Sequence, residues 1–193
     1  MVSPPPTLAP LTPLRLTVDE YDRIITSGSL NDPKRVELID GYMVTKTAKS
    51  PEHSFSTKEA LKALDRLLPP GWTSRKEEPV RIAPYDEPEP DISVVRGYDA
   101  DFRHRLPEVA DVGLVVEVTG TDVSADRLQG NLYGRAGIPV YWIVNLIDRQ
   151  IEVYTDPGPT GYASRNDFVS GQQAPVVIDG VRQRQISVDD ILP

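Results

Sequence analysis

The sequence predicts an α/β domain in which helices flank a mixed β-sheet. Helical and strand patterns alternate in the order α-β-β-α-β-β-β-α-β-β, which is typical of helices packed on a sheet. Residues 112–118 form a nearly continuous apolar run, as expected of a central strand buried on both faces. The length of 193 residues suits a single domain with its own hydrophobic core.

Composition excludes several classes of protein. No apolar run approaches the roughly 20 residues that span a bilayer, and residues 1–6 lack the basic and apolar regions of a secretory signal. We therefore expect a cytoplasmic protein with no membrane partner. Because the chain has no cysteine, a metal would have to bind carboxylates or histidines. The net charge of −8 argues against binding nucleic acid by bulk attraction, although it allows a local basic face.

The N-terminal region divides into an arm and the start of the domain. Residues 1–14 contain five prolines and predict a disordered or polyproline-like arm, so the folded domain is expected over 15–193. Thr17 and Glu20 have the spacing of a capping box at the start of a first helix, and Gly28 can end that helix.

A hairpin and a second helix are expected next. Residues 35–44 predict the hairpin, because two strand-like stretches flank Asp-Gly at 40–41, a favoured two-residue turn. Ser-Pro at 50–51 supplies the N-cap and the first position of a helix, which Pro-Pro-Gly at 69–71 ends.

The rest of the chain alternates between strands and one helix. The polar segment 98–110 predicts a loop or a short helix, and 156–161 predicts a Gly-Pro-rich loop. A third helix is expected over 124–136, ended by Gly137. The remaining strands are expected at residues 79–82, 90–95, 112–118, 140–144, 150–154 and 175–178, with a closing segment at 186–192.

Three acidic residues lie in apolar, strand-like surroundings. Asp91 begins the stretch Asp-Ile-Ser-Val-Val, Glu117 interrupts the most apolar run, and Glu37 lies in Val-Glu-Leu-Ile. A buried carboxylate costs several kcal/mol unless it is paired, protonated or bound to metal. Acids at the ends of adjacent strands can converge on a hard cation such as Mg²⁺. A surface position or a salt bridge more often explains a single such acid, so the pair of Asp91 and Glu117 carries the metal-site hypothesis.

Four stretches of the chain match a known family. They resemble the Uma-two family of restriction-endonuclease-like proteins, a branch of the PD-(D/E)XK nuclease superfamily, over about residues 16–193. The resemblance implies a restriction-endonuclease-like fold and metal-dependent hydrolysis of DNA phosphodiester bonds. The stretches are VELIDG at 36–41, Ser-Pro with His53 at 50–53, Pro-Asp-Ile at 90–92 with Leu-Val-Val-Glu-Val at 114–118, and residues 132–144, which include the distinctive Ala-Gly-Ile-Pro-x-Tyr-Trp-Ile-Val.

The resemblance also implies roles for individual residues. Asp91 and Glu117 would bind Mg²⁺ or Mn²⁺, with Glu37 as an accessory acid. The superfamily places a lysine two residues after the glutamate, where this chain has Thr119. Family members carry the lysine on the following helix instead, after an Asp-Arg pair, where Gln129 is the nearest match. A neutral amide can hold a water but adds no positive charge at a phosphate, so we expect Gln129 to impair catalysis.

Other basic groups have two interpretations each. Arg127, Lys46 and Lys76 are candidates to replace the missing positive charge. His53, at the third position of the second helix, either bonds to the helix start or faces the site. The basic cluster 102–105 either meets a phosphate backbone or, more simply, is a charged loop that answers nearby acids.

Three functional hypotheses follow. The first is a Mg²⁺-dependent endonuclease with DNA as its substrate. The second is a non-catalytic binding or dimerisation module that keeps the nuclease fold, as the missing lysine and the net acidity suggest. In the third, no metal binds and Glu117 belongs to a buried salt bridge. Nucleases of this fold often pair to cut both strands, so a homodimer is expected by analogy.

Overall fold

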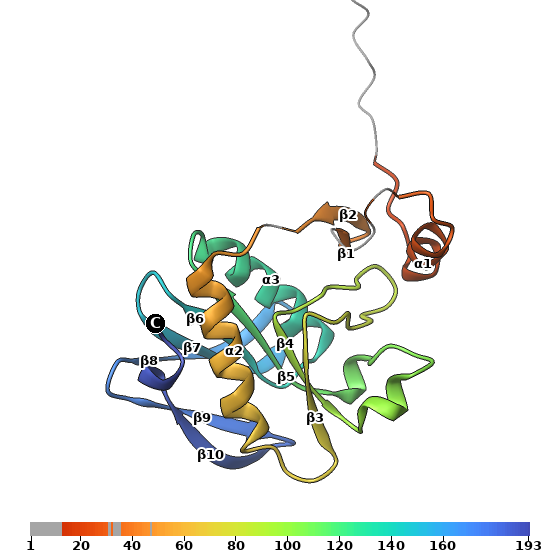
Figure 1. Cartoon of the computed structure of the whole chain (residues 1–193). Helices are drawn as coiled ribbons and strands as arrows, with labels where there is room; N and C mark the ends of the chain where they lie inside the picture. The colour runs from red at the N-terminus through yellow and green to blue at the C-terminus, as the bar shows by residue number, and fades with distance from the viewer. Residues whose placement is uncertain (1–12, 31, 33–35, 47) are drawn as a thin grey trace, which may run out of the picture.

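A six-stranded sheet forms the centre of the computed structural model, which describes residues 13–30, 32, 36–46 and 48–193 (Figure 1). Its strands are β3 (Trp72–Lys76), β4 (Ile92–Arg96), β5 (Val112–Thr119), β6 (Tyr141–Asn145), β7 (Gln150–Gly158) and β8 (Gly161–Val169), in that spatial order. Neighbouring strands are antiparallel except for β5 and β6, which are parallel and are connected by helix α3 (Val123–Ala136). The predicted α/β class with a mixed sheet is confirmed.

Helices cover both faces of this sheet. Helix α2 (Pro51–Asp65) lies on one face and α3 on the other (Figure 1). Alternate side chains of β5 point into the two cores on opposite faces of the sheet. Val116 packs in the cluster that includes α2, and Val115 packs in the cluster that includes α3. Glu117 follows Val115 by two residues and therefore shares the α3 face of the strand.

A small hairpin brings a third acid toward the end of β4. Glu37 lies on strand β1 (Val36–Ile39) of this hairpin. The hairpin packs against helix α1 (Val18–Thr26) through a small apolar cluster. The neighbouring Leu38 accepts a backbone hydrogen bond from Glu87 at 2.8 Å, which ties the hairpin to the segment that leads into β4. These outer elements are α1 (Val18–Thr26), β1 (Val36–Ile39) and β2 (Tyr42–Thr45); the others are η2 (Asp99–Phe102), η3 (Val109–Asp111), β9 (Gln173–Ile178), β10 (Val181–Ser187) and η4 (Val188–Asp190).

Local signals set most of the element boundaries. The Thr17 hydroxyl accepts a hydrogen bond from the Glu20 amide at 3.3 Å, and the Glu20 carboxylate accepts one from the Thr17 amide at 2.8 Å. The predicted capping box is therefore confirmed. The hairpin turn has positive φ angles at Asp40 (51°) and Gly41 (79°), as a type I′ turn requires. A Cβ at Gly41 would also lie 2.7 Å from the Cβ of Arg15, so both backbone conformation and space favour glycine there.

Several predicted elements were wrong in detail. The strand expected at 79–82 forms isolated bridges only, because Glu77 has a positive φ of 53° and Pro79 has no amide hydrogen to donate. The expected loop at 156–161 is instead shared by β7 and β8. Strand β8 was missed because it is a largely exposed edge strand with few apolar residues.

Two further expectations concern the chain as a whole. The arm at 1–14 falls almost wholly outside the described residues, as does Arg35 of the expected first strand, and the domain boundary at 15 stays a prediction. Within the described ranges, no helix is long and apolar enough to cross a membrane.

Candidate active site

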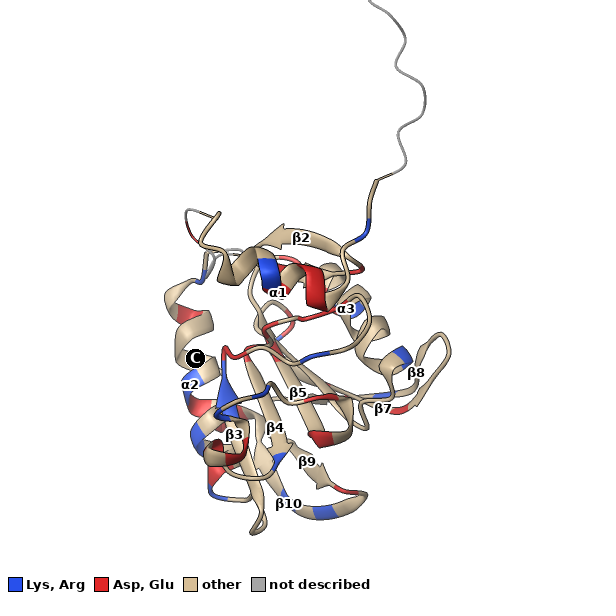
Figure 2. Ribbon diagram, turned by 90° about the vertical axis from the view of Figure 1, so that its right-hand side faces the viewer, with Lys and Arg blue, Asp and Glu red and all other residues tan. Residues whose placement is uncertain are grey.

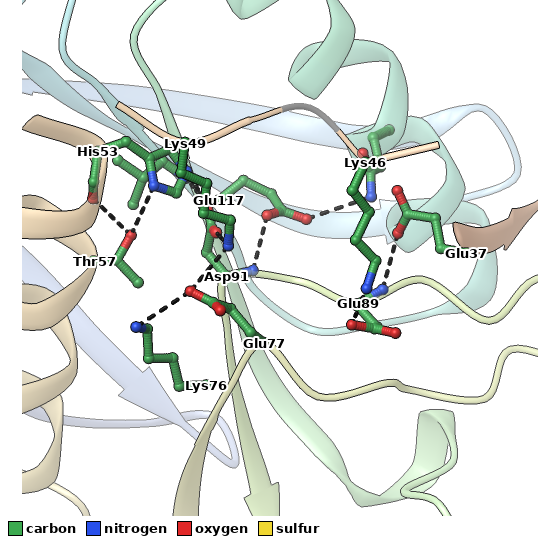
Figure 3. Close-up of polar contacts among 12 residues, drawn as sticks. Glu37, Lys46, Lys49, His53, Thr57, Lys76, Glu77, Glu89, Asp91 and Glu117 are labelled. Carbon is green, nitrogen blue, oxygen red and sulfur yellow. Dashed lines mark hydrogen bonds and ion pairs between the residues drawn. The ribbon is translucent and has the colours of Figure 1, made fainter. Parts of the chain in front are cut away.

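The structure brings Asp91 and Glu117 together at the end of adjacent strands. The Asp91 amide donates to Glu117 Oε2 at 3.0 Å, and the Val118 amide donates to Asp91 Oδ2 at 2.8 Å. The backbone amide of Asp91 therefore holds the carboxyl group of Glu117, and the amide that follows Glu117 holds the carboxylate of Asp91 (Figure 3). Asp91 is 5% exposed and Glu117 is 7% exposed, so the two carboxyl groups are held together with little solvent.

Glu117 is a buried acid with only neutral hydrogen-bond donors. Tyr133 donates its hydroxyl to Glu117 Oε1 at 2.9 Å, and the Gln129 amide approaches the same oxygen at 3.4 Å. Burial raises the pKa of Glu117 well above its ordinary value, and the charge of Asp91 raises it further. No lysine, arginine or histidine of the described ranges forms an ion pair with Glu117, so the buried salt bridge of the third hypothesis has no partner among these residues.

Asp91, in contrast, is held by two basic side chains. Lys49 Nζ lies 2.8 Å from Asp91 Oδ1, and His53 Nε2 lies 2.9 Å from Oδ2. Burial alone would raise the pKa of Asp91, but the hydrogen bonds and charges of His53 and Lys49 outweigh burial and hold that pKa below its usual range. The pair is therefore asymmetric: Asp91 is stabilised as a carboxylate, whereas Glu117 is stabilised as the neutral acid.

The start of helix α2 delivers both basic side chains. Ser50 caps the helix by accepting the His53 amide at 3.2 Å, and Pro51 occupies the first helical position as predicted. Lys49 immediately precedes the cap, so one helix start fixes both residues. The His53 ring also contacts the hydroxyl of buried Thr57 at 3.4 Å through Nδ1. Of the two interpretations of His53, both hold: its amide bonds to the cap and its ring faces the site.

A cavity of about 380 Å³ opens onto these acids. Glu37 and Asp126 also line it. Glu37 accepts the Glu89 amide at 3.0 Å and makes no hydrogen bond to Asp91 or Glu117 within the described residues; burial raises its pKa. Burial raises the pKa of Asp126 to about 6. The charge of Asp91 also raises this pKa, whereas a hydrogen bond with Thr119 lowers it.

Lys49, Glu89, Asp122 and Asp126 are charged cavity residues that sequence reasoning missed as site residues. Asp126 is the first residue of the Asp-Arg pair in the sequence. It lies in the first turn of α3 and lines the cavity. Lys49 carried no signal, because it precedes a helix in an irregular segment whose path the sequence does not fix.

A family model described as "Putative restriction endonuclease" (Uma2) matches residues 18–188. The chain belongs to the Uma2 family. The fold is also that of a solved structure described as "a putative nuclease belonging to DUF820 from Anabaena variabilis ATCC 29413". The two share 16% identity with a TM-score of 0.67 over 91% of this chain and 97% of that one. No curated protein matches the chain.

The three positive charges proposed to replace the Uma2 lysine are all paired with acids other than Asp91 and Glu117, although Lys46 lines the cavity. Arg127 donates two hydrogen bonds to buried Glu152, at 3.0 and 2.6 Å, and so does not enter the cavity. Lys46 pairs with Glu89, and Lys76 lies 3.2 Å from Glu77. Figure 2 shows basic and acidic segments next to one another around β3 and α2, in agreement with this pairing. Gln129 is engaged by Glu117 and, at 3.0 Å, by the Tyr133 hydroxyl.

The basic cluster at 102–105 is separate from the site. Phe102 is buried, with the guanidinium groups of Arg75 and Arg105 at 5.1 and 4.9 Å from its ring centroid. Arg105 also forms an ion pair with Asp111. These contacts fit the simpler interpretation, in which a charged loop of this Uma2 protein forms ion pairs with nearby acids.

The acids fit a hard divalent cation in part. No group of three or more Asp, Glu or His side chains converges within metal-binding distance among the described residues. Mg²⁺, however, is usually bound through only one or two carboxylates and keeps several waters. Asp91 and Glu117 meet that lower requirement, and a bound metal ion would take the place of the proton that burial and the charge of Asp91 favour on Glu117.

Proposed function

We propose that this Uma2 protein is a divalent-metal-dependent endonuclease that hydrolyses phosphodiester bonds in DNA. The observation that carries the proposal is the pair of Asp91 and Glu117, two buried acids from adjacent strands that are bonded through backbone amides at the wall of a cavity. Two like charges so close together with little solvent are costly, and functional sites are where such arrangements concentrate. Membership of a family described as restriction endonucleases supports the reaction class.

The chain's own residues have separate roles in this proposal. Asp91 and Glu117 would hold Mg²⁺ or Mn²⁺, which when bound stabilises charge on a phosphoryl oxygen and makes water more acidic. His53 orients the Asp91 carboxylate through Oδ2. Tyr133 orients Glu117 through Oε1, and Gln129 can hold a water by hydrogen bond. Glu37 and Asp126 add negative charge to the cavity wall without touching either acid of the pair.

Metal titration and DNA cleavage test the proposal directly. In calorimetry, millimolar Mg²⁺ or Mn²⁺ is expected to bind and to raise the unfolding temperature by mass action. Binding should strengthen as the pH rises through about 6, the raised pKa of Asp126, which adds negative charge to the cavity wall, and the raised pKa of Glu117 acts in the same direction. Plasmid DNA is expected to be cut with metal present and left intact with EDTA. Intact plasmid in the presence of a protein shown to be metal-loaded would overturn the proposed endonuclease activity.

Gln129 gives a specific reason to keep the non-catalytic module as a second candidate. Its neutral amide stands where the family carries a lysine, and that amide is already engaged by Glu117 and Tyr133. We expect Gln129→Lys to raise the cleavage rate by about 10-fold or more, because an ammonium group offsets charge that builds on the phosphate. Gln129→Met is the matched control, since it keeps the length of the side chain without a charge.

Plasmid nicking rates of the two variants and the wild type separate the candidates. Cleavage by the wild type, increased in Gln129→Lys and not in Gln129→Met, supports the endonuclease. Cleavage by Gln129→Lys alone would mean that the natural chain is a non-catalytic module. A homodimer, which the fold suggests by analogy only, is checked by light scattering with and without DNA.

A further inference from the structure

Phosphodiester cleavage in this cavity needs a positive charge that Gln129 does not supply. Negative charge builds on the phosphate as the bond breaks, and preorganised positive groups offset it. Arg127 is paired with Glu152 on β7, and Lys46 lines the cavity but is paired with Glu89 and makes no ion pair with Asp91 or Glu117 within the described residues. Lys49 differs from both, because its ammonium group lies 2.8 Å from Asp91 and therefore at the acid pair itself.

The position of Lys49 is fixed from two directions. Its side chain contacts Asp91 Oδ1 and, at 3.0 Å, Glu77 Oε1, while its backbone immediately precedes the Ser50 cap of α2 (Figure 3). A helix start is among the better-ordered places from which a flexible side chain can reach a site. Lys49 and His53 thus come from the same helix start and contact the two different oxygens of the same carboxylate.

Exposure places Lys49 between the acids and the solvent. The Lys49 side chain is 34% exposed, whereas the Asp91 side chain beneath it is 7% exposed. A ligand that approaches Asp91 through the cavity therefore meets the Lys49 ammonium group on the way. An ammonium group has three donors, and Asp91 and Glu77 account for two of them, so one donor is left for a phosphate oxygen.

We propose that Lys49 binds the substrate phosphate next to the Asp91–Glu117 pair and takes over the role of the lysine that is missing at position 129. The proposal rests on the endonuclease function and names the side chain that makes it feasible. A phosphate that enters the cavity accepts a hydrogen bond from the third donor of Lys49, and the contact with Glu77, whose side chain is 40% exposed and easily solvated, can break as the phosphate binds. Lys49 keeps its contact with Asp91 and so holds the phosphate close to the acid pair.

Two glutamine variants test the assignment. Lys49→Gln removes the ammonium group at Asp91, and Lys76→Gln removes one that contacts the same Glu77 but lies outside the cavity lining. With Mg²⁺, Lys49→Gln is expected to lower plasmid cleavage by about 10²-fold. Lys76→Gln should change it by no more than about 3-fold, as for other exposed charges. With Ca²⁺ in place of Mg²⁺, the affinity for a fluorescein-labelled 20-base-pair duplex should fall by about 10-fold in Lys49→Gln only.

Metal affinity distinguishes phosphate binding from a structural role. Lys49→Gln should bind Mn²⁺ at least as tightly as the wild type in calorimetry, because the ammonium group next to Asp91 no longer repels the cation. A merely structural lysine would lower Mn²⁺ affinity, DNA affinity and unfolding temperature together, and that result would overturn the proposal. Lys49→Arg keeps the charge and should recover at least about 10-fold of the lost cleavage.

The remaining outcomes separate this proposal from the function on which it rests. If the wild type cuts DNA and the two glutamine variants behave alike, Lys49 has no such role and the endonuclease stands. If the wild type binds DNA without cutting it, the Ca²⁺ binding comparison still decides whether Lys49 holds the phosphate. If the wild type neither binds nor cuts DNA, the endonuclease function and the role of Lys49 fall together.

Discussion

Replacing Asp91 with asparagine is expected to lower metal-dependent DNA cleavage by about 10³-fold, which corresponds to roughly 4 kcal/mol of lost transition-state stabilisation. The substitution keeps the size of the side chain and an oxygen that can accept the Val118 amide. It removes the negative charge to which Lys49 and His53 are bonded, and it places an amide NH₂ where one of these donors now points. A neutral amide is also a weaker ligand for a hard cation than a carboxylate.

Three measurements check this expectation. Plasmid nicking gives the loss of rate, calorimetry should show no heat of Mn²⁺ binding, and thermal unfolding should show that the variant is folded. Asp111→Asn is the matched control, because Asp111 also accepts a backbone amide and an arginine but lies outside the cavity. Undiminished Mn²⁺ binding by Asp91→Asn would remove Asp91 from the metal site.

The second large effect is expected on stability, at a fully buried acid outside the cavity. Glu152 on β7 is 0% exposed and accepts hydrogen bonds from Arg127, Asn145 and the Tyr154 hydroxyl. Arg165 also lies 3.2 Å from it. Burial alone would raise the pKa of Glu152, but these donors outweigh it and lower the pKa to about 2.

Glu152→Ala is expected to lower the free energy of unfolding by about 3 kcal/mol, because it leaves two guanidinium groups and an amide without their common partner. Both arginines are more than one-third exposed and regain some solvation, so we take the low end of the usual range. For a chain of this length the unfolding temperature should fall by about 6–12 °C. In the wild type this contribution is present above pH 4.5 and is lost as the pH falls toward about 2, since the folded-state pKa is lowered.

Urea denaturation of a matched pair tests the assignment. Asp167→Ala removes another acid that bonds to Arg165, but one whose side chain is 38% exposed, and it should cost no more than about 0.5 kcal/mol. Similar losses in Glu152→Ala and Asp167→Ala would contradict the central place of Glu152. Metal binding should survive in Glu152→Ala at temperatures where it is folded, because Arg127 and Glu152 do not line the cavity.

Much of the architecture was predictable from local patterns. Sequence periods of two residues and continuous apolar runs mark β4, β5 and β6 because these strands are buried, and buried strands must be apolar whatever their neighbours are. The caps at Thr17 and Ser50 were equally predictable, since a cap bonds within three residues of itself. Edge strand β8 lacked such a signal, because its exposed side chains carry no apolar pattern.

The same division holds for the candidate site. The sequence by itself marked Asp91 and Glu117 as acids in apolar surroundings, where a carboxylate is costly, but it did not mark Glu152, which is also buried. Only the tertiary structure decided what surrounds them: that Lys49 and His53 share Asp91, that Asp126 turns toward the cavity, and that Arg127 turns away. The physical reason is range. Burial leaves its mark on a residue's own neighbours in sequence, whereas an ion pair across 25 or 42 residues depends on where the whole chain places two side chains.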